Sequence, residues 1–181
     1  MLARLQGIMS ESAFMPHIKP LVADEWPLLR DMRLAALHES PRVFLSSYQA
    51  EKAFDEQRWR EEFGRGEWIL YVQGDEPTGI VGCTRESGMP TDECYLEYLW
   101  VMPEWRSRGV AQNMVTDVLD HLREAGMRRA YLWVLDGNDA AMRLYKRVGF
   151  ISSDDPQPLA ARPGRTEERM QFNLGAAPGL S

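Results

Sequence analysis

One stretch, Glu97 to Ala111, constrains the fold of this chain more than any other. It includes the end of an apolar, aromatic-rich segment, Tyr95 to Val101, which is typical of a buried strand. Pro103 ends that segment because proline cannot take part in a strand ladder. Apolar residues then recur with the spacing of a helix face, at Val110, Ala111, Met114, Val115, Val118, Leu119 and Leu122.

A short basic turn with Arg106, Arg108 and Gly109 joins this strand to this helix. Unpaired backbone N–H groups and the positive end of the helix dipole converge at such a turn, so it suits an anionic phosphate. Taken alone, the turn is better explained as an ordinary connection with surface arginines. A second signal is therefore needed to give it a function.

The length of 181 residues predicts one domain, which we place at residues 16–174, with a flexible leader at 1–15 and a flexible tail at 175–181. The segment Met1 to Ile8 lacks the continuous apolar core of a signal peptide. No stretch reaches the length of a transmembrane helix. We therefore expect a cytoplasmic protein with no membrane partner.

The net charge of −6 argues against a nucleic-acid-binding surface and favours a cationic substrate. Cys83 and Cys94 are the only cysteines and form no CxxC pair, and histidines are few, so no metal site is predicted. Both cysteines lie in strand-like runs. They are expected to be buried free thiols in a reducing cytosol.

The rest of the chain predicts a mixed sheet with helices on both faces. Asp24 is the expected N-cap of a first helix that ends before Pro41, and a second helix covers 55–63. A further helix capped by Asn138 or Asp139 ends at Gly149. A strand–helix–strand unit across the basic turn implies a parallel pair with a right-handed crossover. The expected strands are 17–22, 68–73, 78–85, 95–101, 128–135, 150–153 and 166–174.

Two motifs resemble one known family. The order Val-x-Pro-x-x-Arg-x-Arg-Gly-x-Ala, from Val101 to Ala111, resembles the acyl-CoA pyrophosphate loop of the GCN5-related N-acetyltransferases, the GNAT family. The run Asn138 to Phe150, with Leu-Tyr-x-x-x-Gly-Phe, looks like that family's second signature. The resemblance implies an α/β fold in which antiparallel N-terminal strands precede a parallel βαβ unit whose central strands splay apart to admit the cofactor.

The resemblance also implies how acetyl-CoA is bound. Backbone N–H groups at Arg106, Arg108, Gly109, Val110 and Ala111 would hold the pyrophosphate. The backbone of Leu99 and Val101 would pair with the pantetheine arm as an added strand does. Asn138 would contact pantetheine as well as capping its helix. Many family members have glycine at the position of Ala111, and alanine keeps the side chain small.

Two residues are candidates for the chemistry. The resemblance gives Tyr145 the role of general acid toward the leaving thiolate, whereas its helical spacing alone favours a core residue. Strict alternation places Glu97 on one strand face with Tyr95, Leu99 and Val101, in a run otherwise fit for burial. It is either the base that deprotonates an amine or a structural glutamate paired with a residue such as Arg85.

The sequence thus predicts an acetyl-CoA-dependent N-acetyltransferase that acts by direct transfer in a ternary complex. The expected acceptor is a small cationic amine, or the N-terminus or a lysine of a protein. The alternative is a non-catalytic acyl-CoA-binding sensor or interaction protein with the same fold, and a homodimer is left open. Nucleotide-binding loops such as G-x-G-x-x-G are absent from the sequence. Trp100 and Trp133 are expected in the core.

Overall fold

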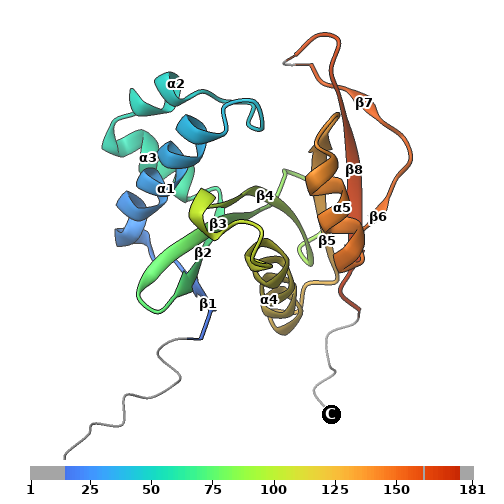
Figure 1. Cartoon of the computed structure of the whole chain (residues 1–181), viewed down its shortest axis with the longest axis horizontal. Helices are drawn as coiled ribbons and strands as arrows, with labels where there is room; N and C mark the ends of the chain where they lie inside the picture. The colour runs from blue at the N-terminus through green and yellow to red at the C-terminus, as the bar shows by residue number, and fades with distance from the viewer. Residues whose placement is uncertain (1–14, 161, 176–181) are drawn as a thin grey trace, which may run out of the picture.

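A mixed eight-stranded sheet, with helices on both sides, forms the centre of the molecule (Figure 1). The computed structural model describes residues 15–160 and 162–175. The strand order is β1-β2-β3-β4-β5-β8-β6, with β7 paired to β8. Apart from Met15 and Gly175, the expected leader and tail lie outside the described residues.

The observed elements follow the expected order closely. The strands are β1 (His17–Pro20), β2 (Gly66–Gln73), β3 (Glu76–Thr84), β4 (Glu93–Val101), β5 (Arg129–Leu135), β6 (Ile151–Ser152), β7 (Gln157–Pro158) and β8 (Thr166–Asn173). The helices are α1 (Trp26–Glu39), α2 (Tyr48–Lys52), α3 (Glu56–Phe63), α4 (Val110–Glu124) and α5 (Asp139–Val148), with 3₁₀ turns at Ala23–Glu25 and Pro103–Trp105.

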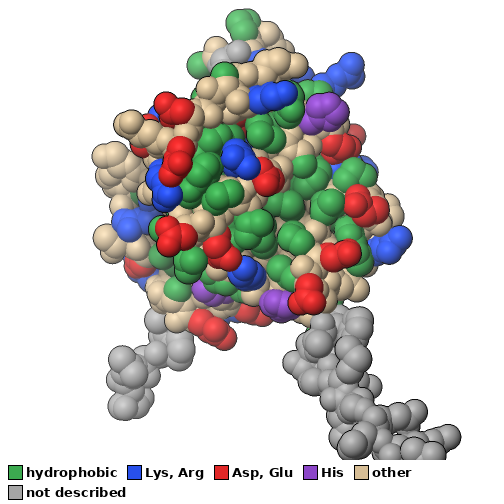
Figure 2. All heavy atoms as spheres, turned by 90° about the vertical axis from the view of Figure 1, so that its left-hand side faces the viewer, with side chains coloured by type: hydrophobic (Ala, Val, Ile, Leu, Met, Phe, Trp, Pro, Cys, Tyr) green, Lys and Arg blue, Asp and Glu red, His purple; other side chains and the backbone are tan. Residues whose placement is uncertain are grey.

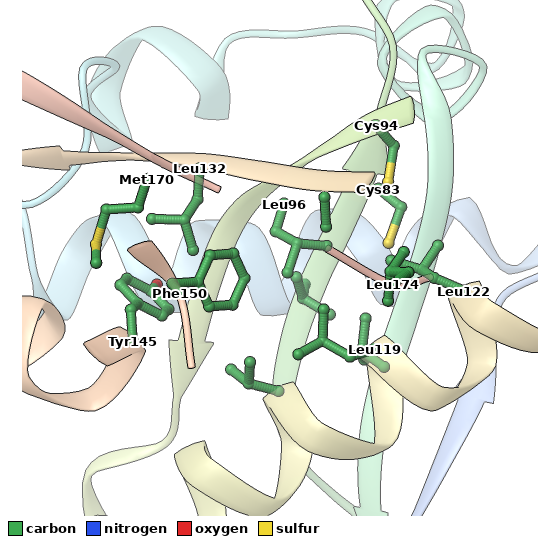
Figure 3. Close-up of a cluster of buried hydrophobic side chains, with 14 of the residues drawn as sticks. Cys83, Cys94, Leu96, Leu119, Leu122, Leu132, Tyr145, Phe150, Met170 and Leu174 are labelled. Carbon is green, nitrogen blue, oxygen red and sulfur yellow. The ribbon is translucent and has the colours of Figure 1, made fainter. Parts of the chain in front are cut away.

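Two apolar layers hold the helices against the sheet. On one face, α4 and α5 pack on a cluster that includes Leu96, Leu119 and Leu132 (Figure 3). On the other face, α1 packs on a second cluster through Leu29 and Leu37, which are almost completely buried. The spacing that predicted the α4 helix is confirmed, because its predicted apolar positions form the buried side of that helix.

The central parallel pair is very short. β4 pairs with β5 only through Glu93–Arg129, Cys94–Ala130 and Tyr95–Tyr131. Within residues 15–160 and 162–175, β4 pairs only with β3 after Tyr95, and β5 pairs only with β8 after Tyr131. The predicted splaying of the central strands is therefore confirmed, and each strand has an unpaired edge toward the other.

A β-bulge interrupts β4 just beyond this parting. Ile80 and Gly82 of β3 pair with Trp100 and Glu97 of β4, respectively. Only Val81 lies between the two β3 residues, whereas two residues lie between the two β4 residues. The first of these two, Tyr98, has a left-handed backbone with φ of 58°. An extra residue on one strand shifts the side-chain alternation, as β-bulges do.

The bulge corrects the predicted surroundings of Glu97. Leu99 and Val101 pack with the residues on the α4 side of the sheet. Glu97 instead pairs with Gly82, at which a Cβ would point at the Trp68 ring in the α1 layer. Glu97 and Leu99 therefore lie on opposite faces, because the strict alternation used in the prediction does not hold across the bulge.

Two smaller expectations are wrong, and one short strand is additional. Asp24 does not cap α1: the residues before Trp26 form a 3₁₀ turn, and Glu25 accepts the Val22 N–H at 3.1 Å. Trp100 is buried as predicted, but Trp133 is only half-buried. The short strand β7 was not predicted, since its two residues carry no periodic pattern.

Both cysteines are buried free thiols, as expected. Burial raises the pKa of the Cys83 thiol well above its ordinary value and that of Cys94 to about 11. Neither thiol is therefore a nucleophile at neutral pH.

The outer surface over α1, α2 and α3 carries acidic, basic and apolar side chains interspersed rather than gathered by kind (Figure 2). In the part of the chain that the structure describes, no helix has the length and apolar character needed to cross a membrane.

The close approach of β2 to β3 gives a test of the sheet register. A Cβ at Gly66 would lie 2.3 Å from the backbone oxygen of Cys83, so we expect Gly66→Ala to destabilise the fold by about 2 kcal/mol or more. Gly64→Ala is the matched control, because a Cβ there meets only ordinary contacts at 3.5 Å and φ is −70°. Urea unfolding of both variants measures the difference, and equal stabilities would contradict this register.

Candidate active site

The basic turn leads into α4 with several amide groups unused. The first hydrogen bond of the helix runs from the Asn113 N–H to the Gly109 carbonyl at 3.0 Å. Among the described residues, no backbone acceptor is found for the N–H groups of Arg108, Gly109, Val110 and Ala111. The helix has no side-chain cap and no acidic residue in its first turn. This end of α4 therefore presents amides and the positive pole of the helix dipole.

The shape of the turn depends on two left-handed residues, Ser107 with φ of 60° and Gly109 with φ of 80°. A Cβ added at Gly109 would meet nothing within 4 Å, so the turn is not covered on that side. The Arg108 guanidinium lies 5.5 Å from the ring centre of Trp105. The turn thus offers room, amides and one exposed cation to an anionic ligand.

Arg106 differs from what the resemblance implies. Its N–H donates to the Pro103 carbonyl at 3.2 Å and is not free for a phosphate. Its guanidinium donates to Glu39 Oε1 at 2.9 Å and to Oε2 at 2.5 Å, while its Nε donates to the Val101 carbonyl at 2.9 Å. Arg106 is therefore bound within the protein, and its side chain fixes the turn to α1 and to the end of β4.

Glu39 is the functional-site residue that sequence reasoning missed. The Arg106 guanidinium holds the pKa of the Glu39 carboxyl down at about 2, and hydrogen bonds from Ser40 and Trp100 act in the same direction against desolvation. The Trp100 indole N–H donates to this carboxylate at 3.1 Å. No sequence motif could have found it, because Glu39 and Arg106 are far apart in the chain.

The unpaired edge of β4 supplies further amides near the turn. The Met102 N–H donates to the Thr78 carbonyl of β3 at 2.9 Å. Because N–H directions alternate along a strand, the N–H groups of Val101 and Leu99 point away from β3, toward the parting from β5. This is the direction that pairing with a pantetheine arm requires, although the Val101 carbonyl already accepts from Arg106.

Tyr145 lies on the α4 and α5 side of the sheet. It is 8% exposed, and its ring centre is 5.6 Å from that of Phe150 (Figure 3). No hydrogen bond from its hydroxyl to another residue is found within residues 15–160 and 162–175. Burial raises the pKa of this phenol far above its ordinary value, so it holds its proton at neutral pH.

Glu97 lies on the opposite face of the parting. Its Oε2 atom is shielded from solvent and accepts no hydrogen bond from any residue that the structure describes. The alternative of an ion pair with Arg85 is not observed at Glu97 within those residues. A buried carboxylate oxygen without a partner is costly in free energy, and such groups mark positions where a ligand or water supplies the missing donor.

Asn138 begins α5, and its side chain accepts the Ala141 N–H at 3.2 Å, which confirms the predicted cap. It also lines a cavity of about 240 Å³ at the carboxyl end of β5, together with Met142 and Glu167. Burial raises the pKa of Glu167. Among the described residues, no group of histidine, cysteine, aspartate and glutamate is arranged to hold a metal ion.

These features define a parted sheet with amides and a phenol on one side and a carboxylate on the other. The family model described as "Acetyltransferase (GNAT) family" matches residues 33–150 of the chain, so the chain belongs to this family. The match spans the turn, β4, α4, β5 and α5, which are the elements that build the candidate site.

Curated relatives match part of the chain. A mycothiol acetyltransferase of Nocardiopsis dassonvillei is 37% identical over 88 residues, which cover 45% of this chain and 26% of the relative. The N-alpha-acetyltransferase RimI of Mycobacterium tuberculosis is 32% identical over 77 residues, which cover 42% and 47%. The chain is therefore aligned with about a quarter to a half of the length of these relatives.

Solved structures share the fold over nearly the whole chain. A putative acetyltransferase from Salmonella typhimurium, solved with its cofactor acetyl-CoA, has a TM-score of 0.70 and covers 92% of this chain and 99% of its own. Its sequence identity is 14%, so the likeness concerns the fold. The predicted architecture, antiparallel strands followed by a splayed parallel unit, is confirmed by this likeness and by the strand pairing.

The Glu39–Arg106 pair predicts a defined pH dependence of stability. The folded pKa of Glu39 lies below its ordinary value of 4.5, so the stabilisation is present above about pH 4.5 and is lost as the pH falls toward 2. Both side chains are partly exposed, so we expect Glu39→Gln to cost only about 1 kcal/mol, or about 2–4 °C in Tm at pH 7.

Thermal unfolding at pH 7, 4 and 3 measures this difference, which we expect to shrink as the pH falls. Glu56→Gln is the control, because Glu56 pairs with Arg60 at 2.8 Å on the surface of α3, away from the turn. A Tm difference at pH 3 as large as that at pH 7 would show that the carboxylate charge of Glu39 is not what stabilises the turn.

Proposed function

We propose that this protein transfers the acetyl group of acetyl-CoA to a primary amine, directly and within a ternary complex. The observation that carries the proposal is the parting of β4 and β5, because proton-donating and proton-accepting groups lie on its opposite faces. Tyr145 belongs to the α5 layer, and Glu97 lies on the α1 side with one carboxylate oxygen unpartnered. Family membership supports the same reaction class.

The turn fits the anionic part of the co-substrate. The amides of Arg108, Gly109, Val110 and Ala111 have no backbone acceptor among the described residues, and Arg108 adds a cation beside them. When bound, acetyl-CoA supplies an activated thioester. The outward N–H of Leu99 orients the pantetheine arm, and the N–H of Val101 donates to the carbonyl oxygen on which negative charge develops.

Two residues of the chain move the protons. Glu97 accepts a proton from the ammonium of the acceptor, directly or through a water, so that a neutral amine is available to attack. Tyr145 donates its proton to the sulfur as the C–N bond forms and the C–S bond breaks, and the second proton lost by the acetylated nitrogen restores the phenol through solvent. Burial raises the pKa of Tyr145, so the phenol holds its proton until the thiolate leaves. No thiol of the chain needs to carry the acetyl group, since both cysteines are buried and protonated.

The acceptor is expected to be cationic. The chain carries a net charge of −6, and Glu97 adds a carboxylate to the acceptor face of the parting. The relatives described above are named for mycothiol and for N-alpha acetylation, so family membership alone leaves the acceptor open. Our proposal is a small cationic amine, or the N-terminus or a lysine of a protein.

The direct test combines binding and turnover. Acetyl-CoA should raise the Tm, as any ligand selective for the native state does, and an amine panel should reveal acetyl-dependent release of free thiol. Binding without thiol release from any amine would favour the alternative, a non-catalytic acyl-CoA sensor. No shift in Tm at saturating acetyl-CoA would overturn the proposal itself.

Tyr145→Phe removes one hydroxyl from a packed ring. Folding and acetyl-CoA affinity should be nearly unchanged, while kcat should fall by roughly ten- to a thousandfold through loss of general-acid help. Steady-state kinetics with a pre-steady-state check that chemistry limits the rate provides the measurement. Wild-type kcat under those conditions would return Tyr145 to a purely structural role.

Glu97→Gln keeps the side-chain volume but cannot accept a proton. The rate should fall most at low pH, where the amine is protonated and a base is most needed. If Glu97 also attracts the ammonium, KM for the amine should rise, and more so at low salt, where the wild-type attraction is strongest. A pH profile and salt dependence identical to those of the wild type would leave the base unidentified.

A further inference from the structure

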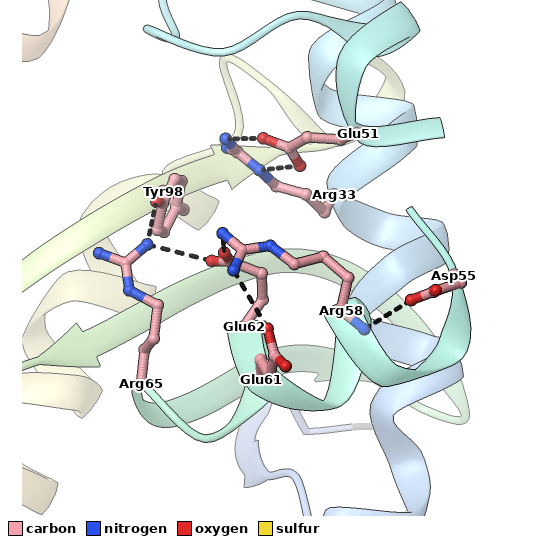
Figure 4. Close-up of polar contacts among 8 residues, drawn as sticks. All are labelled: Arg33, Glu51, Asp55, Arg58, Glu61, Glu62, Arg65 and Tyr98. Carbon is pink, nitrogen blue, oxygen red and sulfur yellow. Dashed lines mark hydrogen bonds and ion pairs between the residues drawn. The ribbon is translucent and has the colours of Figure 1, made fainter. Parts of the chain in front are cut away.

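The bulge residue Tyr98 is held by an unusual set of contacts on the α1 side of the sheet (Figure 4). Its ring stacks on Trp68, with centres 5.3 Å apart and planes at 30°. The Arg33 guanidinium carbon lies 3.9 Å from the centre of the same ring. A left-handed backbone is unfavourable for a bulky residue, so surrounding contacts must maintain it.

Arg33 is itself fixed from two sides. Its Nε and Nη2 donate to the two carboxylate oxygens of Glu51 at 2.9 and 2.8 Å, which joins α1 to α2. Its guanidinium carbon also lies 4.8 Å from the ring centre of Phe44. The side chains of Arg33 and Glu51 are only 6% and 9% exposed. The pair is thus a rigid, planar support directly against the bulge.

The pair is poorly explained by stability alone. Nη1 of Arg33 is buried and has no hydrogen-bond partner among the described residues. A buried ion pair with an unsatisfied donor gains little net free energy, and apolar replacements of both partners are often neutral or stabilising. The pair does fix the orientation of the Arg33 guanidinium. Because this guanidinium stacks on Tyr98, it also sets the position of the Tyr98 ring.

That orientation matters because of where the bulge lies. Glu97 precedes Tyr98 and Leu99 follows it, and the bulge sends these two neighbours to opposite faces of the sheet. A shift of Tyr98 would move the Glu97 carboxylate relative to the outward N–H groups of Leu99 and Val101. Displacements of this kind by about 1 Å can cost on the order of a hundredfold in rate.

The same support extends to the other half of the molecule. The Phe44 carbonyl accepts from Nη2 of Arg162, and the Arg42 carbonyl accepts from Nη1 at 3.1 Å. Arg162 belongs to the segment between β7 and β8, on the far side of the parting. One set of contacts therefore runs from that segment through Phe44 and Arg33 to Tyr98.

We propose that Arg33, fixed by Glu51, is a positioning residue of the acetyl transfer, which holds the Tyr98 bulge so that Glu97 and the strand amides keep their relative geometry. This inference rests on the proposed function for its kinetic consequences. Its structural part, the control of the bulge by Arg33, is independent of turnover.

The main variant is Arg33→Met combined with Glu51→Met, which removes both buried charges and leaves apolar side chains of similar length. We expect a Tm at or near that of the wild type and an acetyl-CoA affinity within about threefold. Hydrogen exchange of the amides at 98–101 should be faster by about tenfold or more, with exchange in α4 unchanged. With an active acceptor, kcat/KM should fall roughly ten- to a hundredfold, and the acid side of the pH profile should move.

The matched control is Arg60→Met with Glu56→Met, another arginine–glutamate pair, which lies on α3 and does not contact Tyr98. It should leave exchange in β4 and the pH profile unchanged. If the main variant does not fold, Tyr98→Gly provides the same test, because glycine accepts the left-handed backbone but removes the ring that Arg33 contacts.

Wild-type exchange at 98–101 in either folded variant would overturn the positioning role. Altered exchange with a wild-type pH profile and kcat/KM would overturn its connection to the reaction. A wild-type protein without any acetyl transfer would refute the proposed function, while the exchange measurement would still decide whether Arg33 holds the bulge.

Discussion

The separation of β4 from β5 after three residue pairs is the constraint on which the rest of the structure depends. Two parallel strands in the middle of a sheet normally satisfy each other's backbone groups along their whole length. Here the outward amides of β4 beyond Tyr95 have no strand partner on that side. The fold compensates by packing α4 and α5 under the parting and α1 above β4, so that the unpaired edge is enclosed but not filled by another strand.

The two faces of the sheet near the parting of β4 and β5 provide different chemical environments. Below the sheet, Tyr145 is surrounded by apolar side chains, and burial keeps its phenol protonated. Above the sheet, Glu97 lies on the Trp68 side, with an oxygen that has no hydrogen-bond partner among the described residues. A reaction that needs one proton removed and another delivered can use both groups, because they lie on opposite faces of the sheet.

The features predicted correctly from the sequence are those that depend on residues close together in the chain. The helical spacing from Val110, the cap at Asn138 and the helix-ending glycine at Gly149 follow from nearby residues alone, and all are observed. The failures have long-range causes. Glu97 was placed on the wrong face relative to Leu99 because no local pattern marks the bulge at Tyr98, whose ring lies against Trp68 and Arg33. Glu39 was missed because its partner Arg106 lies in a distant part of the sequence.

The residues of the basic turn show the same difference between local and long-range effects. The backbone N–H of Arg106 is expected from the motif to hold a phosphate, yet it donates to the Pro103 carbonyl, and the guanidinium is held by Glu39 and by the Val101 carbonyl. The motif locates the turn correctly but does not predict the partners of Arg106. A motif contains residue types and no information about which distant element packs against them. The amides that remain unused belong to the residues after Arg106, where the helix begins.

The bulge also has a consequence for how this strand can change in evolution. Between the same two levels of the ladder, β4 has one residue more than β3. Deleting the extra residue Tyr98 would place Leu99 alone opposite Val81 and restore regular alternation. Trp100 would stay in the α1 layer and Val101 in the α4 layer. A change in length elsewhere in β4 would instead turn the following residues to the opposite face, so insertions and deletions should be confined to the bulge and to the loops on either side of the strand.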